Sequence, residues 1–380
     1  MEISYMDEFN RQGTVYFVND HVTEPLQCID SDDSDSMSTC SSRSASTITS
    51  SEVSDFYQEK YGRVFPVDDN LPVILPVDGM ENERLSTRHR FLQLLIGSNY
   101  FGPFREVMAR TPNPRVLDIR TQEGSWVQEV AAEFPHAHFI SLDVVPMIPH
   151  VPRPNITFEV YDLYAGLAEP DDSFDVVHAR DCIGSVKNYD MLLREFHRIL
   201  RPGGLLLIGE LGTEVYEAWD TDKPACVSAP NTHRGLGIIR EAVKSQGVML
   251  DVLPHISKWL EPGSALWIQD QDRLPMTPPR GQPPQIPISR GTTKQGFTGI
   301  VEKVAHIPNG AWPSDPVLRQ VGALAQGVWK ETWLSIVPLL LDRGLSQDEV
   351  RQILECAIKE LCDPEVRTVW KYSMISCFKL

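Results

Sequence analysis

Short apolar strands alternate with amphipathic helices through the middle of this 380-residue chain, and no other feature restricts the fold as much. Strand patterns occur at residues 115–119, 138–144, 156–162, 174–179, 205–210 and 248–253. Helical spacing of apolar residues occurs at residues 125–134, 189–200 and 233–246. Strands that alternate with helices build a mostly parallel sheet with helices on both faces, and strands rich in Val, Ile and Leu suit burial on both faces. We therefore expect a doubly wound, mostly parallel α/β domain over residues 111–310.

The chain before this domain has two parts. Between Ser31 and Ser54, fourteen of 24 residues are Ser or Thr and none is aromatic. Such a segment buries too little apolar surface to offset the entropy lost on ordering, so we predict a disordered, acidic, Ser-rich tail over residues 1–55. Residues 82–95 repeat apolar side chains at helical spacing, which predicts N-terminal lid helices within residues 56–110.

The chain after residue 253 changes pattern again. Six prolines fall between Pro275 and Pro287, and because proline fixes φ and lacks an N–H donor, we predict a Pro-rich insertion over residues 274–292. Residues 297–307 alternate as a strand does and should return to the sheet. We predict a C-terminal helical extension over residues 311–380, with helices at 317–341 and 346–361. Ser346 and Glu349 have the spacing of a capping box for the second helix.

Charge and cysteine content exclude several classes of protein. The formal net charge is −17, which disfavours binding to nucleic acid or to anionic lipid. No apolar run approaches the roughly 20 residues of a membrane span, and the N-terminus lacks the pattern of a signal peptide. The seven cysteines are scattered, as reduced thiols are, and His136 with His138 lack a third metal ligand nearby. We expect a cytoplasmic or nuclear protein with no bound metal, no nucleic-acid partner and no membrane association.

Acidic residues end several of the predicted strands, where ligands of open α/β sheets bind. These acids are Asp118, Asp143, Asp162 and Glu210. Asp143 follows Asp118 by 25 residues, and a carboxylate there can accept two hydrogen bonds from a ribose. Asp162 could accept a hydrogen bond from an exocyclic amine. The pattern predicts a nucleoside-bearing ligand with positive character rather than a polyphosphate.

The motifs VLDI and EGSW, SLDVVP, FEVYDL, SFDVVHARD and RILRPGGLLLIGE together resemble class I S-adenosylmethionine-dependent methyltransferases. The flanking runs LPVDGMENERLSTRH and IPNGAWPSDPVLRQVG are similar to fungal methyltransferases related to the velvet-complex secondary-metabolism regulator and to trans-aconitate methyltransferases. The resemblance covers about residues 60–370. It implies a Rossmann-like, seven-stranded sheet, S-adenosylmethionine as cofactor and a small-molecule acceptor in fungal secondary metabolism. It leaves open a regulatory protein partner.

The resemblance also implies roles for individual residues. Asp118 and Gly124 would line the methionine half of the cofactor, and Asp143 would hold the ribose hydroxyls. Asp162 and Leu163 would meet the adenine. The backbone near Arg180 would face the sulfonium. The helix at 82–95 would cover the acceptor pocket, with Glu83, Arg84, Arg88 and His89 on it.

One departure from the family pattern leaves two functions open. Arg120 and Gln122 occupy the first two of three positions that are normally glycine, and only Gly124 remains. Their side chains either obstruct the cofactor, or Arg120 pairs with the cofactor carboxylate as a bidentate donor. The chain is accordingly a methyltransferase, or a catalytically inactive regulatory protein with the same fold. If the acceptor must lose a proton, the candidate general bases are His89, His178 and Glu210.

Overall fold

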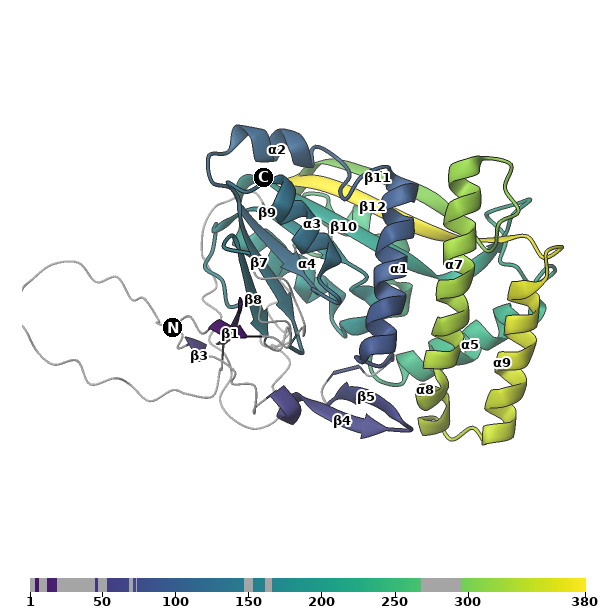
Figure 1. Ribbon diagram of the computed structural model, residues 1–380. Helices are drawn as coiled ribbons and strands as arrows, with labels where there is room; N and C mark the ends of the chain where they lie inside the picture. Colours follow the sequence, from purple (N-terminus) through teal and green to yellow (C-terminus); the bar gives the residue numbers. More distant parts are fainter. Residues whose placement is uncertain are drawn as a thin grey trace, which may run out of the picture.

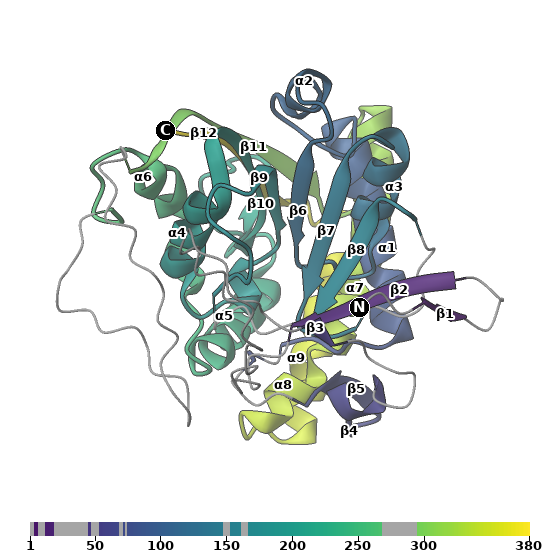
Figure 2. The ribbon, with the colours of Figure 1, turned by 90° about the vertical axis from the view of Figure 1, so that its left-hand side faces the viewer.

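The computed structural model describes residues 4–6, 12–18, 45–46, 53–67, 71–72, 74–146, 153–160, 166–267 and 295–380. For the described residues up to 54, only the backbone is described. Its centre is a large twisted sheet with helices on both sides (Figure 1, Figure 2). None of the helices in these described ranges is both long and apolar enough to cross a membrane. The predicted insertion at 274–292 lies outside the described residues, and so does most of the tail 1–55, whose disorder stays a prediction.

Seven strands form the main part of the sheet. They are β6 (Arg115–Ile119), β7 (His138–Asp143), β8 (Ile156–Val160), β9 (Phe174–Arg180), β10 (Leu200–Glu217), β11 (Phe297–Pro308) and β12 (Thr368–Lys379). Their spatial order is β8-β7-β6-β9-β10-β12-β11. The first five are parallel, and β12 runs antiparallel to both of its neighbours. The predicted mostly parallel, seven-stranded arrangement is confirmed, and the strand order reverses between β6 and β9.

Short strands near the N-terminus extend the sheet beyond β8. They are β1 (Ser4–Met6), β2 (Gln12–Val18) and β3 (Ala45–Ser46), and β2 pairs with β8 in parallel. A separate hairpin follows the short helix η1 (Val53–Phe56) and consists of β4 (Tyr57–Lys60) and β5 (Arg63–Pro66). The region predicted to hold only lid helices therefore begins with a hairpin. The Tyr57 hydroxyl donates to the Pro146 carbonyl at 2.5 Å, which fixes this hairpin beside the end of β7.

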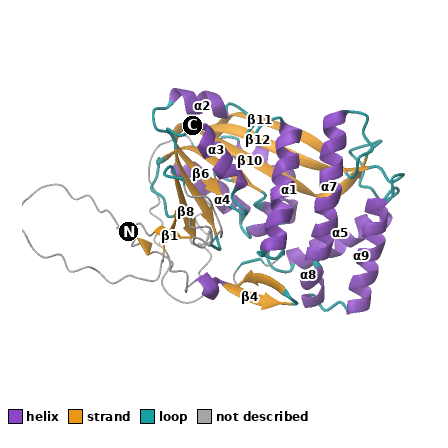
Figure 3. Ribbon diagram, in the orientation of Figure 1, coloured by secondary structure: helices purple, strands orange, loops and turns teal. Residues whose placement is uncertain are grey.

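Helices cover the two faces of the sheet separately (Figure 2, Figure 3). On one side lie α1 (Gly79–Ile96), α2 (Phe104–Arg110) and α3 (Ser125–Glu133), and on the other lie α4 (Tyr189–Ile199), α5 (Pro230–Lys244) and α6 (Ile256–Leu260). Successive side chains of a strand point to opposite faces of the sheet, so one strand packs against both layers of helices. Val116 belongs to the apolar cluster of α2 and α3, and Leu117 belongs to the cluster of α4.

The prediction of a strand at 248–253 is wrong. Residues 250–255 form a 3-10 helix, η4 (Leu250–His255), which buries Leu250 and Val252. A short apolar run does not distinguish a strand from a buried helical turn. Pro254 also has no N–H to donate to a neighbouring strand, so a tight helical turn satisfies this backbone better than a sheet does.

The prediction of a helical extension over 311–380 is correct only as far as Cys362. The helices are α7 (Pro316–Ser335), α8 (Val337–Asp342) and α9 (Gln347–Cys362), and the Ser346–Glu349 capping box is present. The last residues instead form β12, which inserts between β10 and β11. Both faces of β12 are largely buried, and for this reason its sequence lacks the polar alternation of a half-exposed strand. The sheet domain therefore includes residues beyond 310.

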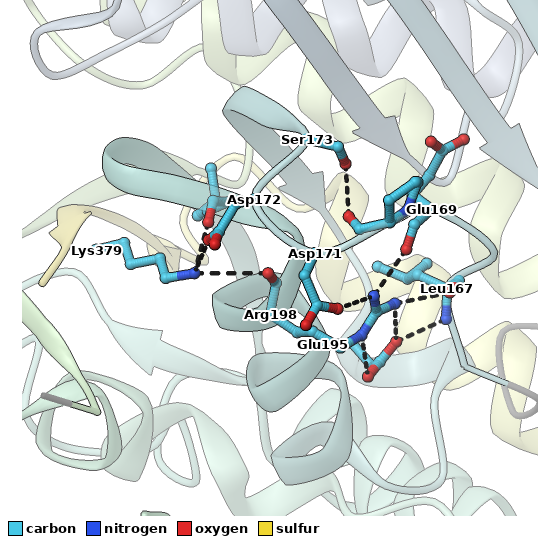
Figure 4. A network of polar contacts seen from close by, with 10 residues as sticks. Leu167, Glu169, Asp171, Asp172, Ser173, Glu195, Arg198 and Lys379 are labelled. Atoms are coloured by element: carbon cyan, nitrogen blue, oxygen red, sulfur yellow. Dashed lines mark hydrogen bonds and ion pairs between the residues drawn. The ribbon is translucent and has the colours of Figure 1, made fainter. Parts of the chain in front are cut away.

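Two groups of polar contacts join distant segments at the end of the sheet where β9 begins (Figure 4). The Arg198 guanidinium on α4 donates to Glu195 at 2.8 Å, to Asp171 at 2.8 Å and to the Leu167 carbonyl at 2.7 Å. Lys379 at the end of β12 donates to the Leu200 carbonyl at 2.6 Å. These contacts fix the segment before β9 and the C-terminal strand, and thereby the positions of β9 and β12 in the sheet.

Candidate functional site

The loop after β6 keeps the backbone conformation that a glycine-rich sequence would adopt. Arg120 has φ +69°, Gln122 has φ +53° and Gly124 has φ +76°. This left-handed region favours glycine because a Cβ atom is crowded there. The loop is held in place by the Arg120 and Thr121 N–H groups, which donate to the Leu142 carbonyl at 2.7 and 3.1 Å. Arg120 and Gln122 therefore adopt the left-handed backbone that glycine favours.

The Arg120 side chain bridges the ends of two strands. Its guanidinium donates to the backbone carbonyl of Asp181, the residue after β9. The two strand ends lie where the strand order reverses, which is the place where open α/β sheets bind ligands. The Gln122 amide nitrogen is buried and has no hydrogen-bond partner among the described residues. Arg120 thus places a cation at the end of the sheet where the strand order reverses.

Asp143, one of the predicted acids, holds this loop at the end of β7. Asp143 accepts hydrogen bonds from the N–H groups of Gln122 at 2.8 Å and Val144 at 2.7 Å. Burial raises the pKa of the Asp143 carboxyl, and these hydrogen bonds and the Arg120 charge act in the opposite direction. Each carboxylate oxygen can accept a second hydrogen bond, so Asp143 retains capacity for ligand hydroxyls.

Asp118 lies at the centre of a buried hydrogen-bond chain. Its Oδ1 lies 2.7 Å from His178 Nδ1, and its Oδ2 accepts from the Ser141 hydroxyl at 2.7 Å. The parallel register places these residues side by side on β6, β7 and β9. The His178 ring stacks on Trp126 of α3, with ring centres 3.6 Å apart. Burial lowers the pKa of His178, although the nearby Asp118 charge raises it, so the imidazole is neutral at neutral pH.

Several buried polar atoms around the crevice lack a partner within the described part of the chain. They include both carboxylate oxygens of Glu123, Oδ2 of Asp181 and Nε of Arg88. Glu123 Oε1 lies 4.0 Å from Arg180, beyond hydrogen-bond distance, while Asp181 Oδ1 accepts from Arg88 at 2.5 Å. A buried carboxylate without hydrogen bonds is unfavourable. Ligand ammonium and hydroxyl groups would satisfy these oxygens, so the donor set of S-adenosylmethionine fits the residues present.

A narrow pocket opens beside these residues, between α1, the segment 98–101, α3 and the strands β9 and β12. Its polar lining includes His89, Asn99, His178, Arg180 and Tyr372. Arg180 Nη1 donates to His89 Nδ1 at 3.1 Å. Burial and the Arg180 charge lower the pKa of His89. Two neutral imidazoles and one guanidinium therefore face the same small space.

Glu210, the third candidate base, has a different environment. Its carboxylate accepts from the N–H groups of Cys182 at 2.9 Å and Ile183 at 3.3 Å, and from the Tyr189 hydroxyl at 2.9 Å. Burial, together with the Asp181 charge, raises the pKa of Glu210 to about 8. Glu210 does not line the pocket beside His178. These contacts indicate that Glu210 orders the turn after β9.

The structure brings most of the candidate residues to one end of the sheet. Those gathered there are His89, Asp118, Arg120, Gly124, Asp143, His178 and Arg180. Asp162 and Leu163 lie outside the described residues, and their contact with adenine stays a prediction. On α1, Arg84 and Arg88 are buried while Glu83 is exposed, so Glu83 does not face the pocket.

Sequence reasoning missed three residues of the site. Glu123 and Trp126 lie in the EGSW run, which contributes to the family resemblance but predicts no role for either residue. Tyr372 lies on β12, in a segment predicted to belong to a helical extension. Its hydroxyl packs directly on Gly209, where a Cβ atom would clash with it. The run VWKYSMISCF has the apolar and β-branched content of a strand, and that signal could have identified β12.

Comparison with known proteins finds similarity to methyltransferases and to a regulator of secondary metabolism. Residues 87–236 match the family model described as a methyltransferase domain. The secondary metabolism regulator laeA of Coprinopsis cinerea is 27% identical over 330 residues, which cover 84% of this chain and 72% of that protein. The methyltransferase pytC of Aspergillus terreus is 26% identical and covers 76% of this chain and 75% of its own length. The methyltransferase str3 of Strobilurus tenacellus is 29% identical over 49% of this chain and 66% of its own length.

Proposed function

We propose that this chain, which matches the methyltransferase-domain family model over residues 87–236, transfers a methyl group from S-adenosylmethionine to a small-molecule acceptor. The observation that supports this function most directly is the cluster of acids after β6, β7 and β9, in which both carboxylate oxygens of Glu123 are buried and accept no hydrogen bond from the residues that the structure describes. A ligand with an ammonium group and ribose hydroxyls would supply hydrogen-bond donors to these carboxylates. The same reasoning makes a polyphosphate ligand unsuitable.

Each residue of the candidate site suits a different part of S-adenosylmethionine. Asp143 would accept hydrogen bonds from the ribose hydroxyls. Glu123 would pair with the ammonium of the methionine half, beside the Asp118 and Gly124 loop. Arg120 would exchange its Asp181 carbonyl contact for the methionine carboxylate, since a guanidinium binds a carboxylate more strongly than a neutral carbonyl. Asp162 and Leu163 would contact the adenine, and the backbone near Arg180 would face the sulfonium.

The bound cofactor supplies an activated methyl group, so the protein needs to align the acceptor and to exclude water. The buried polar residues between α1 and the strand ends suit that task, because polar groups act more strongly where water is absent. The names of the relatives, a secondary metabolism regulator and two methyltransferases, support an acceptor from fungal secondary metabolism. A regulatory protein partner and a cytoplasmic or nuclear location stay predictions.

Titration calorimetry of the full chain with S-adenosylmethionine and S-adenosylhomocysteine tests the proposal. We expect both compounds to bind, and we expect Asp143→Asn to weaken binding at least tenfold, equivalent to about 1.4 kcal/mol. Asp222→Asn is the matched control, because the Asp222 side chain is 94% exposed. If neither compound binds at millimolar concentration, the chain has the fold without the activity, and the inactive regulatory alternative replaces the enzyme.

A further inference from the structure

We infer that Tyr57, on the β4–β5 hairpin, is a positioning residue of the cofactor site, which holds the turn after β7 and with it Asp143 in the arrangement that receives the ribose. The inference rests on the proposed methyltransferase function and adds to it a residue from outside the large sheet. The family model matches the chain only from residue 87 onward, so the hairpin lies before the matched range.

The hairpin is anchored to two helices. Arg63 of β5 donates to the Asp78 carboxylate through Nε at 2.5 Å and Nη2 at 2.9 Å, and Asp78 is also the residue that caps the N-terminus of α1. At the tip of the hairpin, the Tyr61 hydroxyl donates to Asp342 of α8 at 3.0 Å. These contacts fix the hairpin against α1 and α8, so a side chain that extends from it is held in place.

Tyr57 joins this anchored hairpin to the turn that follows β7. Its hydroxyl donates to the Pro146 carbonyl at 2.5 Å. The turn begins at Asp143, whose carboxylate accepts hydrogen bonds from two backbone N–H groups, those of Gln122 and Val144. Among the described residues, no other hydrogen bond reaches Pro146. The turn is therefore held at its start by the contacts of Asp143 and at its end by Tyr57.

The Tyr57 hydroxyl lies close enough to Asp143 to sense its charge. Burial, together with the Asp143 charge, raises the pKa of Tyr57 to about 12. The hydroxyl consequently keeps its proton at neutral pH and remains a hydrogen-bond donor. Replacing Tyr57 by phenylalanine removes this donor and retains the ring, so the variant isolates the contribution of the hydrogen bond.

A turn that is ordered before the ligand arrives increases affinity, because the ligand does not have to order it. The apparent dissociation constant rises as the fraction of molecules in the binding-competent arrangement falls. One hydrogen bond changes such an equilibrium by a factor of about five. Loss of the Tyr57 hydroxyl should therefore weaken the binding of S-adenosylhomocysteine by about fivefold.

Titration calorimetry of the full chain with S-adenosylhomocysteine compares Tyr57→Phe with Tyr61→Phe. Both variants lose one hydroxyl from the same hairpin, but the Tyr61 hydroxyl contacts Asp342 of α8 and not the turn after β7. We expect Tyr57→Phe to weaken binding about fivefold and Tyr61→Phe to stay within about twofold of the unaltered protein. Unchanged affinity in Tyr57→Phe, or equal losses in the two variants, overturns the inference.

A double-mutant cycle with Asp143→Ala tests whether Tyr57 acts through Asp143. In that background the group that Tyr57 positions is gone, so adding Tyr57→Phe should change the affinity by less than about twofold. A further loss of about fivefold would mean that Tyr57 contributes independently of Asp143, which refutes the positioning role. If the unaltered protein binds no S-adenosylhomocysteine at millimolar concentration, the proposed function itself fails, whereas binding that Tyr57→Phe leaves unchanged refutes the inference alone.

Discussion

Replacing Gln122 by glycine should stabilise this protein, although glycine substitutions usually destabilise. Gln122 has φ +53°, and a left-handed non-glycine residue costs about 1 kcal/mol. Its buried amide nitrogen has no hydrogen-bond partner among the described residues, which costs about another 1 kcal/mol. Glycine adds flexibility to the unfolded chain, a loss of about 1 kcal/mol. The N–H bond to Asp143 is a backbone contact and survives the change. The net gain is about 1 kcal/mol in the free energy of unfolding.

Equilibrium unfolding in urea measures this difference directly. Asn113→Gly is the matched control, because Asn113 has φ +55° but an exposed side chain, and asparagine tolerates this conformation. We expect that control to stay within about 0.5 kcal/mol of the unaltered protein. If Gln122→Gly instead loses more than about 1 kcal/mol while the control is unchanged, the glutamine makes stabilising contacts, and the account of a strained loop is wrong.

Two further predictions follow from buried groups at the same end of the sheet. Because the folded pKa of Glu210 is raised to about 8 from 4.5, the unfolded chain loses this proton first, and Glu210 should make the free energy of unfolding fall as pH rises from about 4.5 to 8. Urea midpoints at pH 5.5 and 7.5 should differ less in Glu210→Gln than in the unaltered protein, and an equal difference would contradict the raised pKa. Gly209→Ala should lose about 2 kcal/mol in urea unfolding, because the new Cβ clashes with the Tyr372 hydroxyl. Gly209→Ala combined with Tyr372→Phe should recover part of this loss, and no recovery would place the strain elsewhere.

The sequence predicted the parallel core because its signal is local. The runs at 115–119, 138–144 and 174–179 are short, apolar and flanked by helical patterns, and the structure has β6, β7 and β9 at nearly the same bounds. The error at 248–253 has the opposite cause. A six-residue apolar run satisfies both a strand and a tight helical turn, and the packing of Leu250 and Val252 selected the turn.

The sequence predicted where the candidate site lies but not which residues contact each other there. Acids that follow successive parallel strands must lie at the same end of the sheet, beyond the carboxyl ends of the strands. Asp118 and Asp143 were therefore identifiable from the sequence. Their partners were not. The pairing of Asp118 with His178 spans 60 residues, and Tyr372 reaches the pocket from a strand near the C-terminus. No local pattern encodes such contacts, since they depend on which strands become neighbours.

The sequence by itself determined the class of the protein, because strand and helix periodicity and the order of short motifs are properties of neighbouring residues. It also determined that Arg120 and Gln122 replace glycine. Only the tertiary structure decided what those replacements do. The backbone stayed left-handed, and the Arg120 side chain extended to the Asp181 carbonyl, since the fold had already fixed the distance between β6 and β9. Side chains adapt to a crevice whose walls are set by hydrogen bonds between strands, and those bonds join residues far apart in the chain.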